Sequence, residues 1–245
     1  MNKIVILAAG KGKRMGADVP KVLVKIKGKP MIEYLINSVK KSGVDKEPII
    51  IVSPENEQII KKALRKFKVK YAIQDKQLGT GHALACAKKQ IGKNVDHVLC
   101  FYGDHPFINA STIKRIARSH NGPITMMTTA VMDFKSWRKN FYHWGRVLRS
   151  NGHIKAIVEF KDAEDNIKKI REVNPAIYCF ETKWLWKNIK KLNNKNAQNE
   201  YYLTDLIKLA FSQKLYVESF PIDCEEAIGI NSKEELATAL KVIGK

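Results

Sequence analysis

Short apolar runs alternate along the chain with segments whose apolar residues recur at helical spacing. The run over residues 3–9 ends at Gly10 and predicts a buried strand that leads into a glycine loop. After Pro30, apolar residues recur at helical spacing as far as Gly43, which predicts a helix with both ends marked. The same pattern predicts strands over 48–53, 69–74, 97–102 and 124–131, and helices over 54–67, 80–91 and 109–120. This alternation favours a doubly wound α/β sheet of mainly parallel strands.

The pattern changes in the second half of the chain. Asn151-Gly152 separates two strand-like runs, 145–149 and 153–159, and Asn-Gly is a strong hairpin signal. Further strands are predicted over 173–180 and 215–222, with a helix over 200–213. Ser232 and Glu235 have capping-box spacing, which predicts a final helix. We therefore expect a main domain over 1–231, with 134–172 as a small β-rich lobe on the substrate side, and a C-terminal helix in 232–245.

Length and composition restrict the class of protein. With 245 residues and 44% apolar residues, the chain fits one large α/β domain or two small ones. No apolar run approaches the roughly 18 residues of a membrane span, and the N-terminal run is too short for a signal peptide. The four cysteines are far apart and form no CxxC pair, so neither a zinc site nor a disulfide scaffold is expected. These features predict a cytoplasmic protein that is not bound to a membrane.

The net charge of +20 comes from 44 basic against 24 acidic residues, and only eight of the basic residues are Arg. Lysines are spread along the whole chain, whereas nucleic-acid surfaces usually cluster their bases and use Arg for bidentate phosphate contacts. We therefore predict a solvated, lysine-rich surface without a specific nucleic-acid partner. The charge favours small anionic substrates, through an attraction that salt weakens.

The first predicted strand runs into a glycine-rich and basic segment, Leu-Ala-Ala-Gly-Lys-Gly-Lys-Arg-Met-Gly over 7–16. Small residues allow backbone N–H groups to form an anion site, and Lys11, Lys13, Arg14 and Lys21 add positive charge. The segment is not a Walker A loop, because no Gly-Lys-Ser/Thr closes it. Nor is it a dinucleotide fingerprint, because the third glycine, Gly16, comes one position late. Taken alone, such a turn is equally typical of a solvated loop.

Several motifs together resemble the sugar-phosphate nucleotidyltransferases. Leu-Ala-Ala-Gly-x-Gly-x-Arg-Met, Pro-Lys-Val-Leu and Gly-Lys-Pro-Met-Ile carry the first part of the resemblance. Gln-Asp-Lys-Gln-Leu-Gly-Thr-Gly-His over 74–82 is similar to the uridylyltransferase half of the bifunctional N-acetylglucosamine-1-phosphate uridylyltransferase/acetyltransferases. Isoprenoid-pathway cytidylyltransferases share the Arg-Met-Gly start but lack this block. Further similar blocks lie at 102–106, 145–146, 157–162, 199–205 and 229–231, so the resemblance covers 1–232.

The resemblance implies a nucleotide-diphospho-sugar transferase fold and a nucleotide site. Lys21 is implied to contact the phosphates, and Gln74, Gly79 and Thr80 to recognise uracil. A side-chain amide can pair with a pyrimidine edge, and glycine allows close backbone approach. The implied catalytic residues are Arg14, Lys21 and Asp104. The implied nucleotide-binding residues are Leu7, Ala8, Ala9, Gly10, Lys11, Gly12, Gln74, Gly79, Thr80, Tyr102 and Gly103.

A metal site is implied at Asp104 and Asn231. Asp104 follows a predicted strand, where open α/β sheets bind ligands. One carboxylate, one amide oxygen and phosphate oxygens suit Mg²⁺, the expected cofactor. The alternative interpretation makes Asp104 a turn residue and Asn231 a loop residue before the Ser232 cap.

On the sugar side, the resemblance implies Gly145, Glu159, Asn174, Tyr202 and Thr204. Carboxylate, amide and hydroxyl groups are suited to pairing with hexose hydroxyls, and unpaired buried polar groups penalise the wrong sugar. The chain has Asn-Pro-Ala over 174–176 where the family has Asn-Thr-Gly, so the resemblance implies the reaction class more specifically than the identity of the sugar.

Other polar and aromatic residues are given structural interpretations. His105 stands where the family has a small or apolar residue, and we interpret it as a loop histidine without a catalytic role. His82 is interpreted as structural at a helix start, and Trp137 and Trp144 as packing residues.

The resemblance predicts transfer of a uridylyl group from UTP to N-acetylglucosamine 1-phosphate or a close amino-sugar 1-phosphate, with release of pyrophosphate. The alternatives are transfer with another base or sugar 1-phosphate and, less favoured, a basic nucleic-acid-binding protein without catalysis. The chain contains none of the hexapeptide repeats of a left-handed β-helix, so acetyl transfer is not expected. No particular oligomeric state is predicted.

Overall fold

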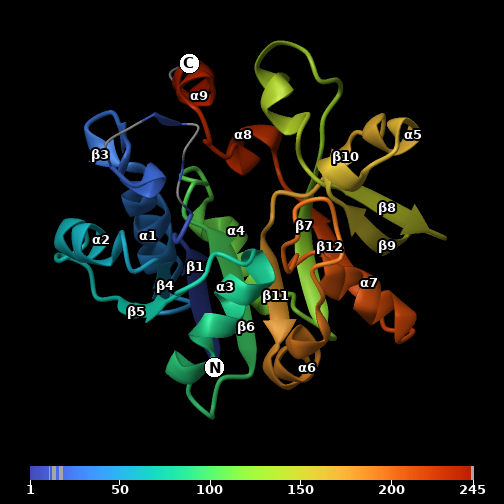
Figure 1. The fold of residues 1–245 in the computed structure, drawn as a ribbon, viewed down its shortest axis with the longest axis horizontal. Coiled ribbons are helices and arrows are strands. Elements are labelled where there is room, and N and C mark those ends of the chain that lie inside the picture. The colour runs from blue at the N-terminus through green and yellow to red at the C-terminus, as the bar shows by residue number, and fades with distance from the viewer. Residues whose placement is uncertain (11, 13–14, 17–18, 244–245) are drawn as a thin grey trace.

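A computed structural model describes residues 1–243 except 11, 13–14 and 17–18. Ten strands form one sheet through the middle of the molecule (Figure 1). Its first half is parallel, in the order β5 (Lys70–Ile73), β4 (Ile49–Val52), β1 (Asn2–Leu7) and β6 (His97–Tyr102). β11 (Tyr178–Glu181) then runs antiparallel between β6 and β7 (Ile124–Ala130), and β12 (Val217–Pro221) pairs parallel with β7. The mixed, mainly parallel sheet confirms the predicted fold class.

The predicted hairpin continues this sheet. β8 (Arg146–Ser150) pairs with β9 (His153–Val158), and β10 (Glu172–Val173) joins β8 to β7. Asn151 and Gly152 both have positive φ, 49° and 80°, as a type I′ turn requires. Two further short strands, β2 (Lys25–Ile26) and β3 (Lys29–Pro30), pair separately from the main sheet.

Helices cover both faces of the sheet (Figure 1). On one face, α1 (Met31–Ser42), α2 (Glu57–Ala63) and α4 (Ala110–Arg118) pack in one apolar cluster. On the other, α3 (Thr80–Cys86), α6 (Thr182–Asn188) and α7 (Asp205–Ser212) pack in a second. Alternate residues of β1 enter the two clusters, Ile4 and Ile6 the first and Val5 and Leu7 the second. α8 (Cys224–Ala227) and α9 (Lys233–Ile243) join a third cluster, and α5 (Asp165–Lys168) follows the hairpin.

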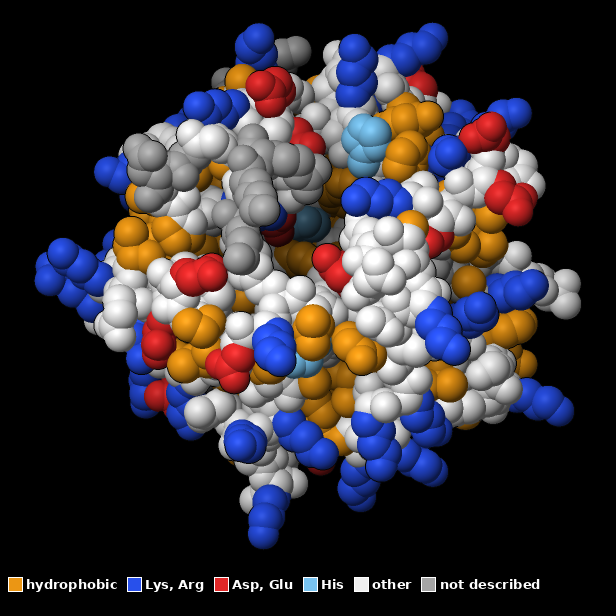
Figure 2. All heavy atoms as spheres, viewed as in Figure 1, with side chains coloured by type: hydrophobic (Ala, Val, Ile, Leu, Met, Phe, Trp, Pro, Cys, Tyr) orange, Lys and Arg blue, Asp and Glu red, His pale blue; other side chains and the backbone are white. Residues whose placement is uncertain are grey.

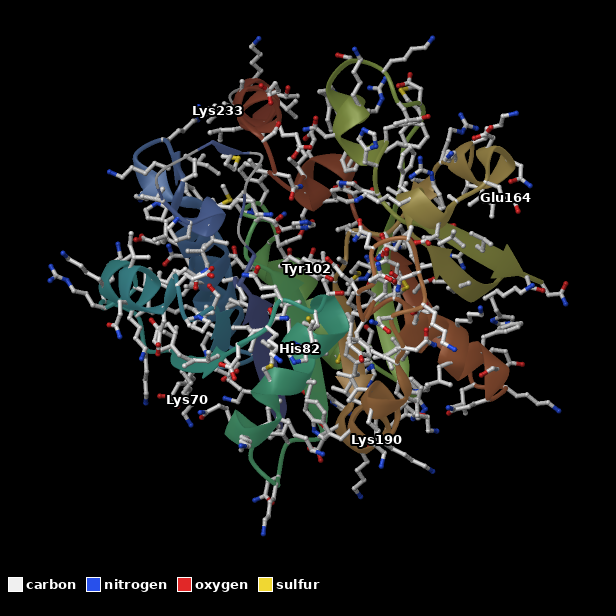
Figure 3. The ribbon with its side chains drawn as sticks, viewed as in Figure 1. Lys70, His82, Tyr102, Glu164, Lys190 and Lys233 are labelled. Carbon is white, nitrogen blue, oxygen red and sulfur yellow. The ribbon has the colours of Figure 1, made fainter. Side chains whose placement is uncertain are left out.

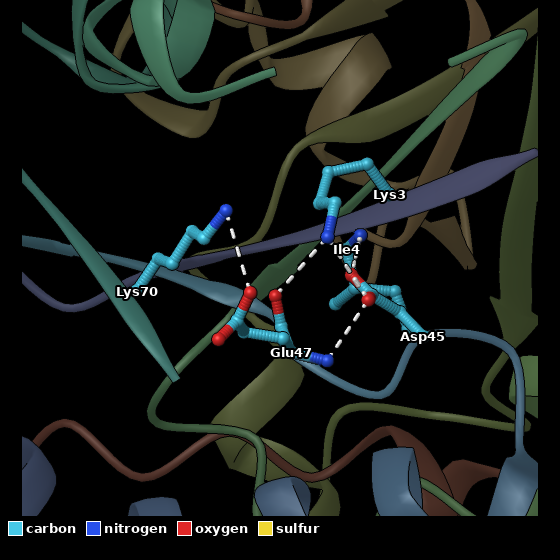
Figure 4. Close-up of polar contacts among 5 residues, drawn as sticks. All are labelled: Lys3, Ile4, Asp45, Glu47 and Lys70. Atoms are coloured by element: carbon cyan, nitrogen blue, oxygen red, sulfur yellow. Dashed lines mark hydrogen bonds and ion pairs between the residues drawn. The ribbon is translucent and has the colours of Figure 1, made fainter. Parts of the chain in front are cut away.

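A buried carboxylate joins the loop before β4 to β1. Oδ2 of Asp45 accepts the Ile4 N–H at 2.8 Å, and Oδ1 accepts both Nζ of Lys3 and the Glu47 N–H (Figure 4). Lys70, on β5, pairs with the Glu47 carboxylate at 3.3 Å. These contacts tie the amino-terminal ends of the parallel strands together, opposite to the ends from which the loops of the candidate site emerge.

Four predicted elements differ from the structure. The strand predicted over 173–180 is split into β10 and β11, because Pro175 lacks an N–H and Ala176 adopts a left-handed φ of 57°. The helix predicted over 200–213 begins only at Asp205, since the backbone before it bonds to residues 78–81. The helix predicted over 54–67 is the shorter α2. The helix predicted over 80–91 stays α-helical only to Cys86 and continues as a 3-10 turn, Ala87–Gln90. Within the described residues, no helix has the length and apolar character to cross a bilayer.

Candidate functional site

A cleft of about 450 Å³ opens at the carboxyl ends of β1 and β6, the place where open α/β sheets bind ligands. Figure 2 shows a hollow near the middle of the molecule, with Lys and Arg side chains spread over the visible face rather than gathered in one patch. Figure 3 labels Tyr102 near the centre of the view and His82, on α3, below it. The described lining residues are Leu7, Ala8, Ala9, Gly10, Gly12, Lys21, Val22, Gln74, Gln77, Gly79, Thr80, Ala83, Tyr102, Asp104, Glu200 and Asn231.

Lys21 joins the two residues that were expected to hold a metal. Its Nζ lies 2.5 Å from Oδ2 of Asp104 and 2.8 Å from Oδ1 of Asn231, although Asn231 is 210 positions away in the sequence. Burial alone would raise the pKa of Asp104, but the nearby Lys21 ammonium outweighs it and lowers that pKa below its usual value. Asp104 and Asn231 therefore present oxygen atoms to one shared cation position.

Local structure explains how these three side chains meet. Lys21 begins a 3-10 turn, Lys21–Leu23, and Gly12 approaches its Cβ so closely that a Cβ on Gly12 would lie 2.6 Å away. The Asn231 N–H donates to Oε2 of Glu235, and Ser232 Oγ accepts the Glu235 N–H. The predicted cap is thus present, with the glutamate reaching back to Asn231 rather than to Ser232. This holds Asn231 at the start of α9.

The opposite wall of the cleft carries the residues expected to recognise a base. Gln74 is 4% exposed, and its Nε2 lies 3.1 Å from the Gly79 carbonyl oxygen and 3.2 Å from Nδ1 of His82. Gly79 needs its φ of 108° and has no room for a side chain, because a Cβ would lie 2.7 Å from the Tyr201 carbonyl oxygen. Thr80 Oγ1 accepts the Leu203 N–H at 3.1 Å.

Sequence reasoning missed other residues of this wall. Gln77 lines the cleft and donates from Nε2 to the Ala9 carbonyl oxygen at 2.6 Å, which links the base wall to the loop after β1. Glu200, Val22 and Ala83 also line it. Gln77 and Glu200 lie inside two of the similar sequence blocks, so a close look at every polar residue of those blocks would have found them.

The five residues expected on the sugar side form their own cluster and do not line the cleft. Thr204 Oγ1 donates to Oε1 of Glu159 at 3.0 Å, and Glu159 lies 3.5 Å from the place of a Gly145 Cβ. The Asn174 N–H donates to the Gly145 carbonyl oxygen. Glu159 and Tyr202 line a second cavity of about 650 Å³. Burial raises the pKa of Glu159, although the bond from Thr204 opposes this.

The segment before α7 joins this cluster to the base wall. Tyr201 exchanges backbone hydrogen bonds with the base wall, donating to the Leu78 carbonyl oxygen and accepting the Gly81 N–H. Thr80 bonds to Leu203, the residue directly before Thr204. The two sets of expected site residues therefore share one backbone scaffold.

Three residues expected in the nucleotide site are not among the described residues that line the cleft. Gly103 is buried beneath it, donating its N–H to the Leu7 carbonyl oxygen. Lys11 and Arg14, expected in the nucleotide site, lie outside the described residues. Trp137 and Trp144 pack in the third apolar cluster, as predicted. Among the described residues, no three His, Cys, Asp or Glu side chains converge to hold a metal ion. The candidate cation site consists of the Asp104 carboxylate and the Asn231 amide oxygen that meet at Lys21 Nζ.

Two curated proteins are similar to this chain over nearly its whole length. The chain is 38% identical over 242 residues to "Bifunctional protein GlmU" of Clostridium botulinum (strain Eklund 17B) and 41% identical over 239 residues to that of Caldicellulosiruptor saccharolyticus. These matches cover 98% and 96% of this chain, but the chain spans only about half the length of the curated relatives it matches.

Solved structures share the fold at lower identity. A putative glucose-1-phosphate thymidylyltransferase from Bacillus anthracis aligns with a TM-score of 0.76 at 19% identity, over 99% of this chain and 95% of the other. An inositol-1-phosphate CTP transferase from T. maritima aligns with a TM-score of 0.74 at 18% identity, over 98% and 97%. Residues 4–198 match the family model of the MobA-like NTP transferase domain. The chain belongs to this nucleotidyltransferase family.

Proposed function

We propose that the protein transfers a uridylyl group from UTP to N-acetylglucosamine 1-phosphate or a close amino-sugar 1-phosphate, giving a UDP-sugar and pyrophosphate. The observation that carries the proposal is the meeting of Lys21, Asp104 and Asn231 in the same cleft as Gln74, Gly79 and Thr80. A cationic centre for phosphates and an amide-bearing wall for a base thus face one space. The relatives named GlmU support the same assignment.

The proposed base site rests on Gln74 and Gly79. The Gln74 amide nitrogen faces the Gly79 carbonyl oxygen and Nδ1 of His82, which fixes the amide and leaves Oε1 as the atom that can accept from a pyrimidine N–H. At Gly79 the Tyr201 backbone and the Glu200 side chain occupy the place of a Cβ, so only glycine lets this segment pack there and hold its carbonyl oxygen against the Gln74 amide.

The proposed sugar site rests on Glu159, Asn174 and Thr204. Asn174 donates from Nδ2 to the Tyr178 hydroxyl at 2.5 Å and accepts the Ala176 N–H, so its amide is fixed in one orientation. Fixed amide and carboxylate groups can discriminate among hexose hydroxyls, because a mismatched sugar leaves buried polar groups unpaired.

The reaction needs little covalent chemistry from the protein. A phosphate oxygen of the sugar 1-phosphate forms a bond to the α-phosphorus of UTP while the bond from that phosphorus to the bridging oxygen breaks and pyrophosphate leaves. The attacking phosphate is already anionic at neutral pH, so no general base is required. Lys21 and the backbone after β1 would position and neutralise the phosphates.

Asp104 and Asn231 fit a magnesium ion. Their oxygens already converge on one cation, Lys21 Nζ, and Mg²⁺ commonly takes one or two protein oxygens and completes its shell with water and phosphate. When bound there, Mg²⁺ would neutralise charge on the phosphate oxygens.

The test is a panel of nucleoside triphosphates against sugar 1-phosphates, with pyrophosphate release as the readout. UTP with N-acetylglucosamine 1-phosphate should give the highest kcat/KM. The proposal would be contradicted if no pair of substrates in the panel released pyrophosphate. It would also be contradicted if nucleoside triphosphates with all four bases were used at equal rates. A second candidate, transfer to a different sugar 1-phosphate, is favoured by the left-handed turn at Pro175-Ala176 beside Asn174, and the same panel decides between them.

A further inference from the structure

His105 directly follows Asp104, and its ring lies inside the protein. Its side chain is 8% exposed, and one face of the ring stacks on Trp144, with centroids 5.5 Å apart and planes 20° apart. Another edge lies against Gly229, where an added Cβ would be 2.6 Å from Nε2. The ring therefore fills the space between two segments that are far apart in the sequence.

Both segments carry other residues of the candidate site. Trp144 directly precedes Gly145, and Gly229 lies two positions before Asn231. The Ile230 N–H donates to the Asp104 carbonyl oxygen at 2.9 Å, so the 229–231 segment is also bonded to the backbone beside His105. One ring thus borders the segments that present Asp104, Asn231 and Gly145.

The bonding of the two ring nitrogens differs from that of an ordinary buried histidine. Nδ1 is buried and has no hydrogen-bond partner among the described residues, and Nε2 lies 3.9 Å from Oδ1 of Asp104, too far for a hydrogen bond. Leaving a buried polar atom unpaired is unfavourable, and an apolar side chain would avoid this cost. A flat ring of this size is nevertheless held between an indole and a glycine.

We propose that His105 is a positioning residue for the nucleotidyl transfer, an inference that rests on the proposed function. Its ring acts as a spacer between Trp144 and Gly229, and so sets the distances among Asp104, Asn231 and Gly145. Among the described residues, the hydrogen bonds of Gln74 go to Gly79 and His82 rather than to His105, whose nearest ring on the cleft is Tyr102, with centroids 6.1 Å apart. Loss of the ring should therefore impair cation binding and turnover while leaving the affinity for UTP largely intact.

The test compares His105→Ala, Trp144→Leu and their double variant with Trp137→Leu, a matched control. Trp137 packs on Phe141 in the same apolar cluster but makes no ring contact with His105. We expect His105→Ala to lower kcat by about 10²-fold, since a displacement of about 1 Å can have that effect. KM for UTP should change by less than about threefold, and the double variant should lose little more than His105→Ala, because the two rings act as a unit.

A second readout does not depend on turnover. Mn²⁺ binding to the protein alone, followed by electron paramagnetic resonance, should weaken in His105→Ala and in Gly229→Ala, whose Cβ displaces the ring, and stay at the wild-type level in Trp137→Leu. Thermal unfolding shows which variants are folded. If His105→Ala does not fold, Gly229→Ala replaces it.

Three results would overturn the positioning role. These are wild-type Mn²⁺ affinity in the folded His105 or Gly229 variant, full additivity of the His105 and Trp144 effects on kcat, or an equal loss in Trp137→Leu. Failure of the proposed function has a different signature, namely a wild-type protein that releases no pyrophosphate with any substrate pair. Even then, the Mn²⁺ titration shows whether the His105 ring sets the spacing of Asp104 and Asn231.

Discussion

Nζ of Lys21 lies 2.5 Å from Oδ2 of Asp104, at the floor of the candidate cleft. The same nitrogen lies 2.8 Å from Oδ1 of Asn231, so the ammonium stands at the position where a bound cation would meet both oxygens. The side chains of Lys21 and Asp104 are 17% and 9% exposed, which strengthens the attraction between them relative to a surface pair. The positive charge of Lys21 and the negative charge of Asp104 therefore determine whether the cleft can bind phosphates and a cation.

Removing either charge should greatly reduce transfer. Lys21→Ala and Asp104→Asn should each lower kcat/KM by about 10²–10³-fold, the usual effect of losing one preorganised charge-stabilising group. Pyrophosphate release measures the loss, and circular dichroism confirms that each variant is folded. Near-normal turnover in a folded variant would contradict the role given to that residue.

Lys21 and a divalent cation should compete for the same oxygens. Without nucleotide, Lys21→Met should bind Mn²⁺ at least about tenfold more tightly than the wild type, a difference of about 1.4 kcal/mol, because the ammonium no longer holds Asp104 and Asn231. Asp104→Asn should bind it more weakly. Lys190→Met, a change on the outer surface (Figure 3), serves as the control. Equal affinity in the wild type and Lys21→Met would show that the two cations do not compete.

The left-handed residue in the split strand should carry backbone strain. Ala176 has a φ of 57°, which costs a residue with a Cβ about 1–2 kcal/mol, whereas glycine adopts it freely. We expect Ala176→Gly to raise the free energy of unfolding by up to about 1 kcal/mol, since glycine's larger entropy in the unfolded chain offsets part of the gain. Ala163→Gly, at a φ of −85°, should destabilise the protein instead. Urea unfolding measures both, and a loss of stability in Ala176→Gly would contradict the argument.

The sequence predicted the elements whose signals are local. Pro30 and Gly43 bound α1 as expected, and Asn151-Gly152 forms the predicted turn. The elements that differ are decided by distant partners. The start of α7 depends on hydrogen bonds from 201–203 to the loop before α3, and the break in the 173–180 strand depends on an uncommon φ at Ala176. The hydrophobic periodicity of one segment cannot predict either the start of α7 or the break in the strand.

In the candidate site, too, some residues could be predicted from local sequence and others depend on distant contacts. The resemblance to the family implied Lys21, Gln74 and Asp104 for one site, and all three line the same cleft. Gln74 ends a predicted strand and Asp104 follows one, so their places at the edge of the sheet could also be predicted locally. The spacer role of His105 could not be seen, since it arises from contacts with Trp144 and Gly229, which are 39 and 124 positions away in the sequence. Whether a residue lies at a turn can be predicted from its neighbours, but what its side chain touches depends on how the loops meet.

A histidine at the other end of the sheet should make stability fall in acid. The Nδ1 atom of His120 is hydrogen-bonded to Thr125 Oγ1, and its ring packs edge-on against His97. Burial, reinforced by the nearby His97, lowers the pKa of His120 from 6.5 to about 4. Between these values the unfolded chain binds a proton that the folded protein does not. This contribution to stability is therefore complete above pH 6.5 and is lost as the pH falls towards 4.

His120→Asn should remove this part of the acid sensitivity. Between pH 7 and pH 5 the wild type should lose about 1 kcal/mol more unfolding free energy than the variant, less than full linkage predicts because the ring is only half-buried. Urea unfolding at a series of pH values measures the difference, with His153→Gln, at an exposed hairpin position, as the control that should follow the wild type. Identical pH dependence in the wild type and His120→Asn would mean that His120 titrates alike in the folded and unfolded chain. The loss of stability in acid would then have to come from carboxylates. Asp104, which is paired with Lys21, is one carboxylate whose pKa is lowered in the folded protein.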